Sequence, residues 1–222
     1  MISVTMAYYN RPDELRRSIS AYKKLYSGFE LSICDDRSEP SIHTDFPEAV
    51  SFDTVIHRVD SDHTLPLNPC VPLNIAVNQS KHDIIVLTNP EIEHREDVFT
   101  SMMELLDKNS YVTARCVDDR GVLAGKEVDY STDGRLPVPE GAHFHFCAML
   151  CRELWEKAGG FDEDYRFGQA CEDNDWLWRL HRVGAEFKHT EKTVYHHQTH
   201  VKWNLPHNKD LFYRKWPSLI SA

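Results

Sequence analysis

The residues best suited to chemistry in this sequence are carboxylates that stand at the ends of apolar segments. The first is Glu91, which follows the apolar run 84–87 (Ile-Ile-Val-Leu) by way of Thr88, Asn89 and Pro90. A continuous apolar run is typical of a central strand in a parallel sheet, because helices cover both faces of such a strand. Pro90 cannot donate to a ladder, so we expect the oxygens of Asn89 and Glu91 to lie at the rim of the sheet. These oxygens suit a hard cation or a sugar hydroxyl, although an Asn-Pro pair also begins many ordinary turns.

A second acidic group, residues 172–175 (Glu-Asp-Asn-Asp), stands at the start of a predicted helix. The apolar face of this helix is expected at Trp176, Leu177, Leu180 and Val183, with Gly184 at its end. Carboxylates in a first helical turn are stabilised by the helix dipole and by free backbone N–H groups, so capping is the ordinary explanation, and it is the one we expect for Asp175. Three acids in four residues exceed what a cap requires, which favours a functional role for the group.

The third acidic group, Asp35 and Asp36, ends the predicted strand 29–34 (Phe-Glu-Leu-Ser-Ile-Cys). A strand is also expected over 2–7, and Pro12 suits the first position of the helix that follows it. Together these segments form a βαβ unit, in which the end of the second strand is the usual place for an acid that binds a nucleoside. The sequence has no Gly-x-Gly-x-x-Gly and no Walker-type loop, so we expect a metal to hold the phosphates instead.

The remaining segments continue the alternation of strands and helices. Further strands are expected at 54–59, 111–115 and 143–150 and around Phe187 and Val194, and further helices at 96–108, 152–158 and within 68–77. On the helix 96–108, the packing face is expected at Val98, Met102, Leu105 and Leu106. The polar segment 117–139 is typical of an active-site loop or a small hairpin. No repeat or linker divides the chain, so a single domain over 1–222 is expected.

Composition excludes several classes of function. Among 222 residues, 35 are acidic and 25 basic, which gives a formal net charge of −10. This charge argues against a nucleic-acid or anionic-membrane surface. No segment has the length of a membrane-spanning helix or the layout of a signal peptide, so we expect a cytoplasmic protein without an integral membrane segment. The six cysteines include no Cys-x-x-Cys pair, and we interpret them as reduced core residues.

Taken together, these motifs resemble those of glycosyltransferases of the GT-A fold. The amino half is similar to the large inverting family that includes bacterial polysaccharide synthases. The carboxyl half, through 159–163 (Gly-Gly-Phe-Asp-Glu) and 172–175, resembles the carboxyl-terminal segment of galactosyltransferases. The resemblance implies an α/β fold with one GT-A (nucleotide-diphospho-sugar transferase) domain, built on a Rossmann-like, mostly parallel sheet flanked by helices. It also implies a nucleotide-sugar half at 1–91 and an acceptor and catalytic half at 92–222.

On the donor side, the resemblance assigns roles to the first two strand ends. In that family a tyrosine after the first strand stacks on the nucleobase and an acid after the second strand bonds it; these positions fall on Tyr9 and Asp36, and a UDP-sugar is the expected donor. The family's Asp-x-Asp motif falls on Asn89-Pro90-Glu91, so asparagine replaces the first aspartate and glutamate the second. The expected nucleotide-binding residues are Ala7, Tyr9, Asp35, Asp36, Asn68, Asn74 and Asn89.

The same resemblance implies a metal and a catalytic base. Mn²⁺ or Mg²⁺ would be held by Glu91 and by a late histidine, for which His196, His197 and His200 are candidates. We expect His197 and His200, which are three residues apart and could share a helical or turn face, although a strand would put them on opposite faces.

The Glu-Asp pair of the motif makes Asp173 the general base and Glu172 a residue that bonds acceptor or donor hydroxyls. The enzyme would move a sugar from a nucleotide diphosphate to a carbohydrate acceptor with inversion.

Three other classes stay open. A nucleotidyltransferase would want a loop rich in glycine and arginine near the first strand, and 7–12 (Ala-Tyr-Tyr-Asn-Arg-Pro) is not one. A zinc hydrolase would want a His-Glu-x-x-His helix, which the sequence lacks, and His143 and His145 lie in an apolar predicted strand where core packing explains them at least as well. A non-catalytic sugar-binding or nucleotide-binding relative is favoured by one feature, which is Asn89 in place of an acid.

Overall fold

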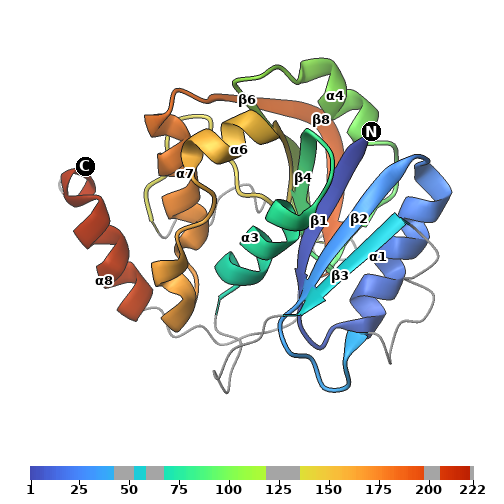
Figure 1. Ribbon diagram of the computed structural model, residues 1–222. Coiled ribbons are helices and arrows are strands. Elements are labelled where there is room, and N and C mark those ends of the chain that lie inside the picture. The colour runs from blue at the N-terminus through green and yellow to red at the C-terminus, as the bar shows by residue number, and fades with distance from the viewer. Residues whose placement is uncertain (43–52, 59–67, 119–135, 198–205, 221–222) are drawn as a thin grey trace.

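The computed structural model describes residues 1–42, 53–58, 68–118, 136–197 and 206–220. Within these residues an eight-stranded sheet forms the centre of the molecule, in the strand order β3-β2-β1-β4-β7-β6-β8-β5. Helices lie on both faces of this sheet (Figure 1). The α/β architecture that the sequence predicts, with a sheet flanked by helices, is therefore confirmed.

The first four strands in the sheet order run parallel to one another. They are β1 (Ile2–Tyr8), β2 (Phe29–Asp35), β3 (Asp53–Arg58) and β4 (Ile84–Thr88). Helix α1 (Pro12–Leu25) connects β1 to β2, and α3 (Cys70–Gln79) precedes β4. Pro12 stands at the start of α1, as expected. Because the strands are parallel, their carboxyl ends share one edge of the sheet, which is the lower edge in Figure 1.

The second half of the chain adds strands of both directions. Strand β7 (Cys147–Cys151) is antiparallel to β4 and to β6 (Ser110–Asp118), whereas β8 (Glu186–His196) is parallel to β6 and antiparallel to β5 (Ile92–His94). The α-helices of this half are α4 (Phe99–Leu105), α6 (Arg152–Ala158), α7 (Glu172–Arg182) and α8 (Pro206–Lys215). Two 3₁₀ helices, η2 (Glu163–Phe167) and η3 (Pro217–Leu219), complete the set within the described residues.

The core has two layers, one on each face of the sheet, because successive side chains of a strand point to opposite faces. On β4, Val86 belongs to the layer under α1 and α4, while Ile85 and Leu87 belong to the layer under α3, α6 and α7. On β7, Met149 and Leu150 divide in the same way. All five side chains are fully buried, so the uninterrupted apolar run is explained by helices on both sides.

Three element predictions are corrected by the structure. The strand expected at 143–150 begins only at Cys147, and the preceding residues form a turn in which the His143 ring stacks on His189. The helix expected from residue 96 begins at Phe99, because the Asp97 side chain accepts the Thr100 N–H there. Leu105 ends this helix and is 37% exposed, so it is not part of the packing face.

The strands expected around Phe187 and Val194 are one strand, β8. Most of the polar segment 117–139 lies outside the described residues. None of the six cysteines is in a disulfide, as expected, and five of them are buried. In the described part of the chain, every helix is too short or too polar to cross a bilayer.

Candidate active site

Glu91 lies just beyond β4, at the edge of the sheet where the sequence predicts it, and it is already paired. The Arg11 guanidinium, which directly precedes α1, lies 2.7 Å from Glu91 Oε1, and His196 Nε2 lies 3.7 Å from the same oxygen. Burial would raise the pKa of Glu91, but His196 and Arg11 outweigh it and lower the pKa to about 2. Glu91 is therefore a carboxylate at neutral pH. Its second oxygen, Oε2, is buried without a hydrogen-bond partner among the described residues.

Within the described residues, the imidazole of His196 pairs with this carboxylate. His197, which directly follows β8, has its Nε2 2.8 Å from Glu93 Oε2. The backbone of His197 reaches Glu91, through its N–H to the Glu91 carbonyl at 3.0 Å. His197, expected to hold the metal with Glu91, thus lies beside Glu91 through its backbone and beside Glu93 through its side chain. His200 lies outside the described residues.

Asp173 is held by a buried imidazole at the start of α7. His145 Nδ1 lies 2.7 Å from Asp173 Oδ1, and His145 is 4% exposed. Burial would lower the pKa of His145, but the nearby Asp173 carboxylate, helped by Glu172 and Glu91, raises it above its usual range. A quarter of the Asp173 side chain stays exposed. The Asp173 carboxylate, which is the candidate general base, therefore contacts His145 on one side and solvent on the other.

Glu172 lies deeper and is joined to the other half of the chain. Asn68 Nδ2 donates to Glu172 Oε2 at 2.6 Å, while Asn68 Oδ1 accepts the Cys70 N–H at the start of α3. Burial of the Glu172 carboxyl, and then the charge of Asp173, raise the pKa of Glu172 to about 7. Asn68, expected to bind the nucleotide, contacts the acidic motif itself.

Asp175 does not act as a helix cap, which corrects the role expected for it. Its side chain is 2% exposed and points away from Asp173, toward the C-terminal helix. Trp216 Nε1 donates to Asp175 Oδ1 at 2.8 Å, and the Tyr165 hydroxyl donates to the same oxygen at 3.3 Å. Two residues along a helix correspond to about 200° of rotation, so Asp173 and Asp175 face different neighbours. Asp175 thus anchors α8 to α7.

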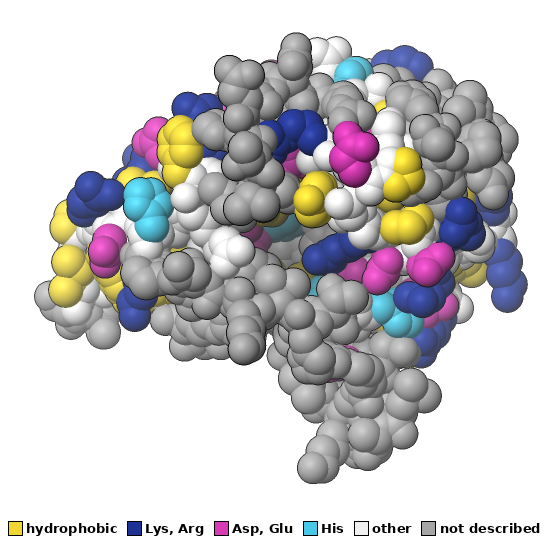
Figure 2. Space-filling view, turned by 90° about the horizontal axis from the view of Figure 1, so that it is seen from below, with side chains coloured by type: hydrophobic (Ala, Val, Ile, Leu, Met, Phe, Trp, Pro, Cys, Tyr) yellow, Lys and Arg dark blue, Asp and Glu magenta, His cyan; other side chains and the backbone are white. Residues whose placement is uncertain are grey.

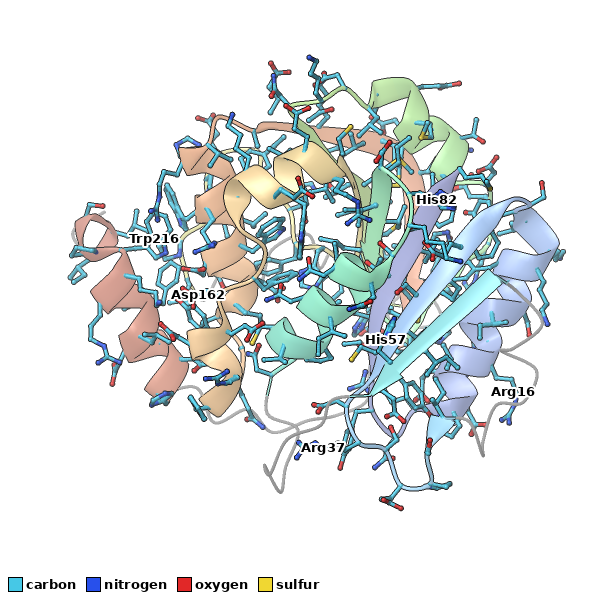
Figure 3. The ribbon with its side chains drawn as sticks, in the orientation of Figure 1. Arg16, Arg37, His57, His82, Asp162 and Trp216 are labelled. Atoms are coloured by element: carbon cyan, nitrogen blue, oxygen red, sulfur yellow. The ribbon has the colours of Figure 1, made fainter. Side chains whose placement is uncertain are left out.

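Helix α8 also holds the loop that leads into the acidic motif. Asn208 is fully buried and its Nδ2 donates to the carbonyls of Tyr165 and Ala170, at 3.0 and 2.8 Å. Ala170 and Cys171 both have positive φ angles, a conformation that costs energy for residues with a Cβ. Figure 3 shows Trp216 and Asp162 on the side of α7 that carries α8, where Lys215 donates to Asp162 at 2.6 Å.

The ends of β1 and β2, where the sequence predicts the nucleotide, lie side by side because the two strands pair in parallel. Tyr9 follows β1 and is 38% exposed, while Asp36 follows β2 and donates its N–H to the Tyr8 carbonyl at 2.8 Å. The Asp36 side chain lies 3.4 Å from Arg37, which Figure 3 places at the lower edge of the molecule. Asp35 differs from its neighbour: its two oxygens accept the N–H groups of Ser38 and Ile42, so it shapes the turn.

The three other expected nucleotide-binding residues have separate positions. Ala7 is partly buried in β1. Asn74 on α3 is engaged with the backbone, because its amide exchanges two hydrogen bonds with Phe161, each of 2.9 Å. Asn89 accepts the Ile92 N–H through its carbonyl and is partly exposed at the end of β4. Asn74 thus supports the Gly-Gly-Phe segment, whereas Ala7 and Asn89 lie at or near the strand ends.

The acids from the two halves of the chain meet around His145. Asp173 and Glu172 from α7 and Glu91 from the end of β4 all act on this imidazole. Figure 2 looks onto the same edge and shows acidic, basic and histidine side chains gathered on it. Sequence reasoning missed the contacts of His145 and Asn208, since each depends on a partner far away in the chain. The arrangement can bind a polar ligand at the rim and take up a proton at Asp173.

Comparison with sequence families gives one match. The model of the family described as glycosyl transferase family 2 matches residues 3–153, which is more than half of the chain. No curated protein sequence matches the chain.

Solved structures with a similar fold include a mannosyltransferase and a protein in complex with a nucleotide sugar. TarS 1-349 from S. aureus superposes with a TM-score of 0.69 at 13% identity, covering 88% of this chain and 60% of its own. The same fragment in complex with UDP-GlcNAc gives 0.73 at 12% identity, covering 99% and 65%. Mannosyltransferase PcManGT from Pyrobaculum calidifontis, in complex with GDP-Man and Mn²⁺, gives 0.65 at 14% identity, covering 91% and 58%. At these identities the likeness concerns the fold, which agrees with the predicted GT-A architecture, and the chain spans less than two thirds of each of these proteins.

Proposed function

This chain belongs to glycosyl transferase family 2, and we propose that it moves a sugar from a nucleotide-diphosphate donor to a hydroxyl of a carbohydrate acceptor. The transfer would invert the configuration at the anomeric carbon. One observation carries this proposal: Asp173 on α7 lies 2.7 Å from the buried His145 imidazole, and the charge of Glu91, at the end of β4, acts on the same ring. The binding site of the donor sugar and the general base that deprotonates the acceptor hydroxyl would then share one edge of the sheet.

For the donor, we favour a UDP-sugar held between the ends of β1 and β2. Tyr9 offers an exposed ring on which the nucleobase can stack. Asp36 offers a carboxylate that can accept hydrogen bonds from the edge of the nucleobase. Segment 1–91 would hold the donor and 92–222 the acceptor. In the similar structures the bound donors are UDP-GlcNAc and GDP-Man, so both nucleotides belong in the test.

A divalent metal would be held at this site by protein oxygens together with the diphosphate of the donor. Mg²⁺ is commonly bound by only one or two carboxylates together with substrate phosphates. Glu91 supplies a buried oxygen, Oε2, that has no partner among the described residues, and we assign the metal to it, with His200 as a further candidate. The described residues contain no group of three or more His, Cys, Asp or Glu side chains able to hold a metal alone. When bound, Mn²⁺ or Mg²⁺ would neutralise charge on the leaving diphosphate.

The remaining chemistry falls to the acidic motif. As the acceptor oxygen forms its bond to the anomeric carbon, Asp173 takes the proton from that hydroxyl, and the bond between the sugar and the diphosphate breaks with its electron pair leaving on the nucleotide. Arg11 lies at the rim beside Glu91 and adds positive charge near the leaving group. Glu172, with its pKa raised to about 7, carries a proton in part of the molecules at neutral pH and can donate as well as accept a hydrogen bond to a sugar hydroxyl.

A second candidate is a non-catalytic relative that binds a nucleotide or a sugar. It is favoured by Asn89 in place of an acid and by the ion pair that already neutralises Glu91. A thermal-shift screen of UDP-glucose, UDP-GlcNAc, GDP-mannose and dTDP-glucose, with and without Mn²⁺, identifies the donor. Release of the free nucleoside diphosphate from that donor then separates the two candidates. We expect UDP-sugars to stabilise the protein most and to be turned over, whereas binding without any release of UDP would favour the non-catalytic relative.

A further inference from the structure

His145 is a buried polar group for which the proposed transfer reaction has no direct use. The residue precedes β7 and is 4% exposed, with its ring against the edge of Phe161 at a centroid distance of 4.9 Å. Core histidines are commonly neutral and satisfied by a backbone carbonyl or a hydroxyl. Here the nearest charged partner is the carboxylate of Asp173, with Nδ1 and Oδ1 2.7 Å apart. The contact joins two segments 28 positions apart in sequence, so it is a product of the fold.

The two oxygens of Asp173 have different surroundings. Oδ1 is buried against the imidazole, while a quarter of the Asp173 side chain is exposed and must belong to its other atoms. A carboxylate that is free to rotate presents either oxygen to a substrate, whereas the ion pair of Oδ1 with the His145 ring restrains the carboxylate and leaves Oδ2 for the acceptor. Fixed orientation of a reacting group lowers the entropic cost of the reaction, and a small misplacement of that group lowers the rate strongly.

The charges that face His145 come from two elements. Asp173 and Glu172 lie on α7, and Glu91 lies at the end of β4. All three are acidic, so they favour a ring that carries a proton on Nδ1, which is the tautomer or charge state able to donate to Oδ1. Burial works against the charged ring, and the acidic neighbours outweigh it.

We propose that His145 is the positioning residue of the transfer reaction: its imidazole, with Nδ1 2.7 Å from Asp173 Oδ1, pairs with that oxygen so that Oδ2 faces the acceptor hydroxyl. The inference rests on the proposed function, because it assumes that Asp173 takes the acceptor's proton. His145 itself touches no substrate in this account. The Asp173 carboxylate raises the pKa of His145, so replacing His145 should change how the rate depends on pH.

Two variants of the full chain test the role. His145→Phe keeps a ring against Phe161 but has no donor, and His145→Asn loses the ring but places an amide N–H where Nδ1 was. The readout is UDP release from UDP-GlcNAc into water, which needs no identified acceptor, followed as kcat and KM across pH 5–9. We expect His145→Phe to lose roughly 10- to 100-fold in kcat with KM nearly unchanged, since a misplaced base loses much of the effect of general-base catalysis. His145→Asn should recover most of that loss, with an acidic limb that differs from that of the wild type.

The contrary results are distinct. A normal kcat in His145→Phe overturns the proposal. So does a His145→Asn variant that folds but is as slow as His145→Phe, because a polar N–H at the position of Nδ1 would then have no effect on the rate. If His145→Phe does not fold, imidazole NMR titration decides, with the His145 signal assigned by its loss in His145→Asn. The pKa of His145 should fall in Asp173→Asn, and an unchanged titration contradicts the pairing. If the wild type releases no nucleotide from any donor, the proposed function fails and takes the positioning role with it, while the titration still reports the pair.

Discussion

Asn68 Nδ2 and Glu172 Oε2 lie 2.6 Å apart, which joins the segment before α3 to the first residue of α7. The two residues are 104 positions apart in sequence. Because Glu172 is buried and its pKa is raised to about 7, the folded protein binds a proton there that the unfolded chain releases near its ordinary value of 4.5. Asn68 thus holds a carboxyl whose charge is unfavourable in the folded state.

We predict that Glu172→Gln changes how stability depends on pH. Between pH 4.5 and about 7 the folded state of the wild type binds more protons at this position, so its free energy of unfolding falls as the pH rises through that window. Glutamine does not titrate, so the free energy of unfolding of the variant does not fall for this reason. Glu172→Gln should gain roughly 1–3 kcal/mol over the wild type on going from pH 4.5 to pH 8, by the conversion between pKa shift and free energy.

Urea unfolding at both pH values measures this difference, with Glu156→Gln, an exposed glutamate on α6, as the matched control. His145 also has a raised pKa, and its contribution to stability is present below its unfolded value of 6.5 and is lost as the pH rises through the higher folded value. A Glu172→Gln advantage that is equal at both pH values would mean that the Glu172 pKa is ordinary.

The donor assignment predicts a loss of nucleotide affinity in Tyr9→Ala. Stacking of a base on an aromatic ring contributes about 1–3 kcal/mol, so UDP should bind roughly 5- to 150-fold more weakly to the variant. Phe167→Ala, which removes another exposed ring from the 3₁₀ helix η2, is the control and should leave UDP binding unchanged. Calorimetric titration with UDP, GDP and dTDP gives the affinities, and tighter binding of GDP or dTDP to the wild type would refute the preference for UDP.

The metal assignment predicts that Glu91→Gln weakens the binding of UDP in the presence of Mn²⁺ but not in the presence of EDTA. The neutral amide can no longer offer a charged oxygen to the cation, and the ion pair with Arg11 is lost at the same time. Glu93→Gln is the control. Glu93 lies on β5, close to Glu91 in the chain, but its side chain pairs with His197 and Arg95. If the wild type is fully active in EDTA and Glu91→Gln is equally active, Arg11 rather than a metal neutralises the leaving group.

The strands and helices that position the site could be predicted from sequence because their signals are local. The apolar run before Glu91 and the Gly159-Gly160 stop of α6 both correspond to observed boundaries. Strand β5 was not predicted, since its three residues are defined by pairing with β8 and not by a pattern of their own. The start of β7 was placed too early, because the apolar and aromatic residues before Cys147 have the composition of a strand but pack in a turn.

The site was harder to predict than the fold for a related reason. The acidic motif at 172–175 is visible as an excess of charge, but the partner of each acid is set by tertiary structure. Asp175 was expected to cap α7 and instead accepts a hydrogen bond from Trp216, 41 positions away. Core packing was expected to explain His145 at least as well as a metal site, because its position between two phenylalanines gives no sign of the carboxylate that it contacts.

The most direct measurement of the central claim compares the turnover of Asp173→Asn with that of Asp175→Asn. Asparagine keeps the shape of Asp173 and can still accept from His145, but it cannot take a proton, so kcat should fall by roughly 10²–10⁴-fold while donor affinity stays the same. Asp175→Asn lies on the opposite side of α7, and it should change the free energy of unfolding by about 1 kcal/mol and keep most of the activity. Near-normal turnover in a folded Asp173→Asn variant would contradict the assignment of the base, and with it the account of this site.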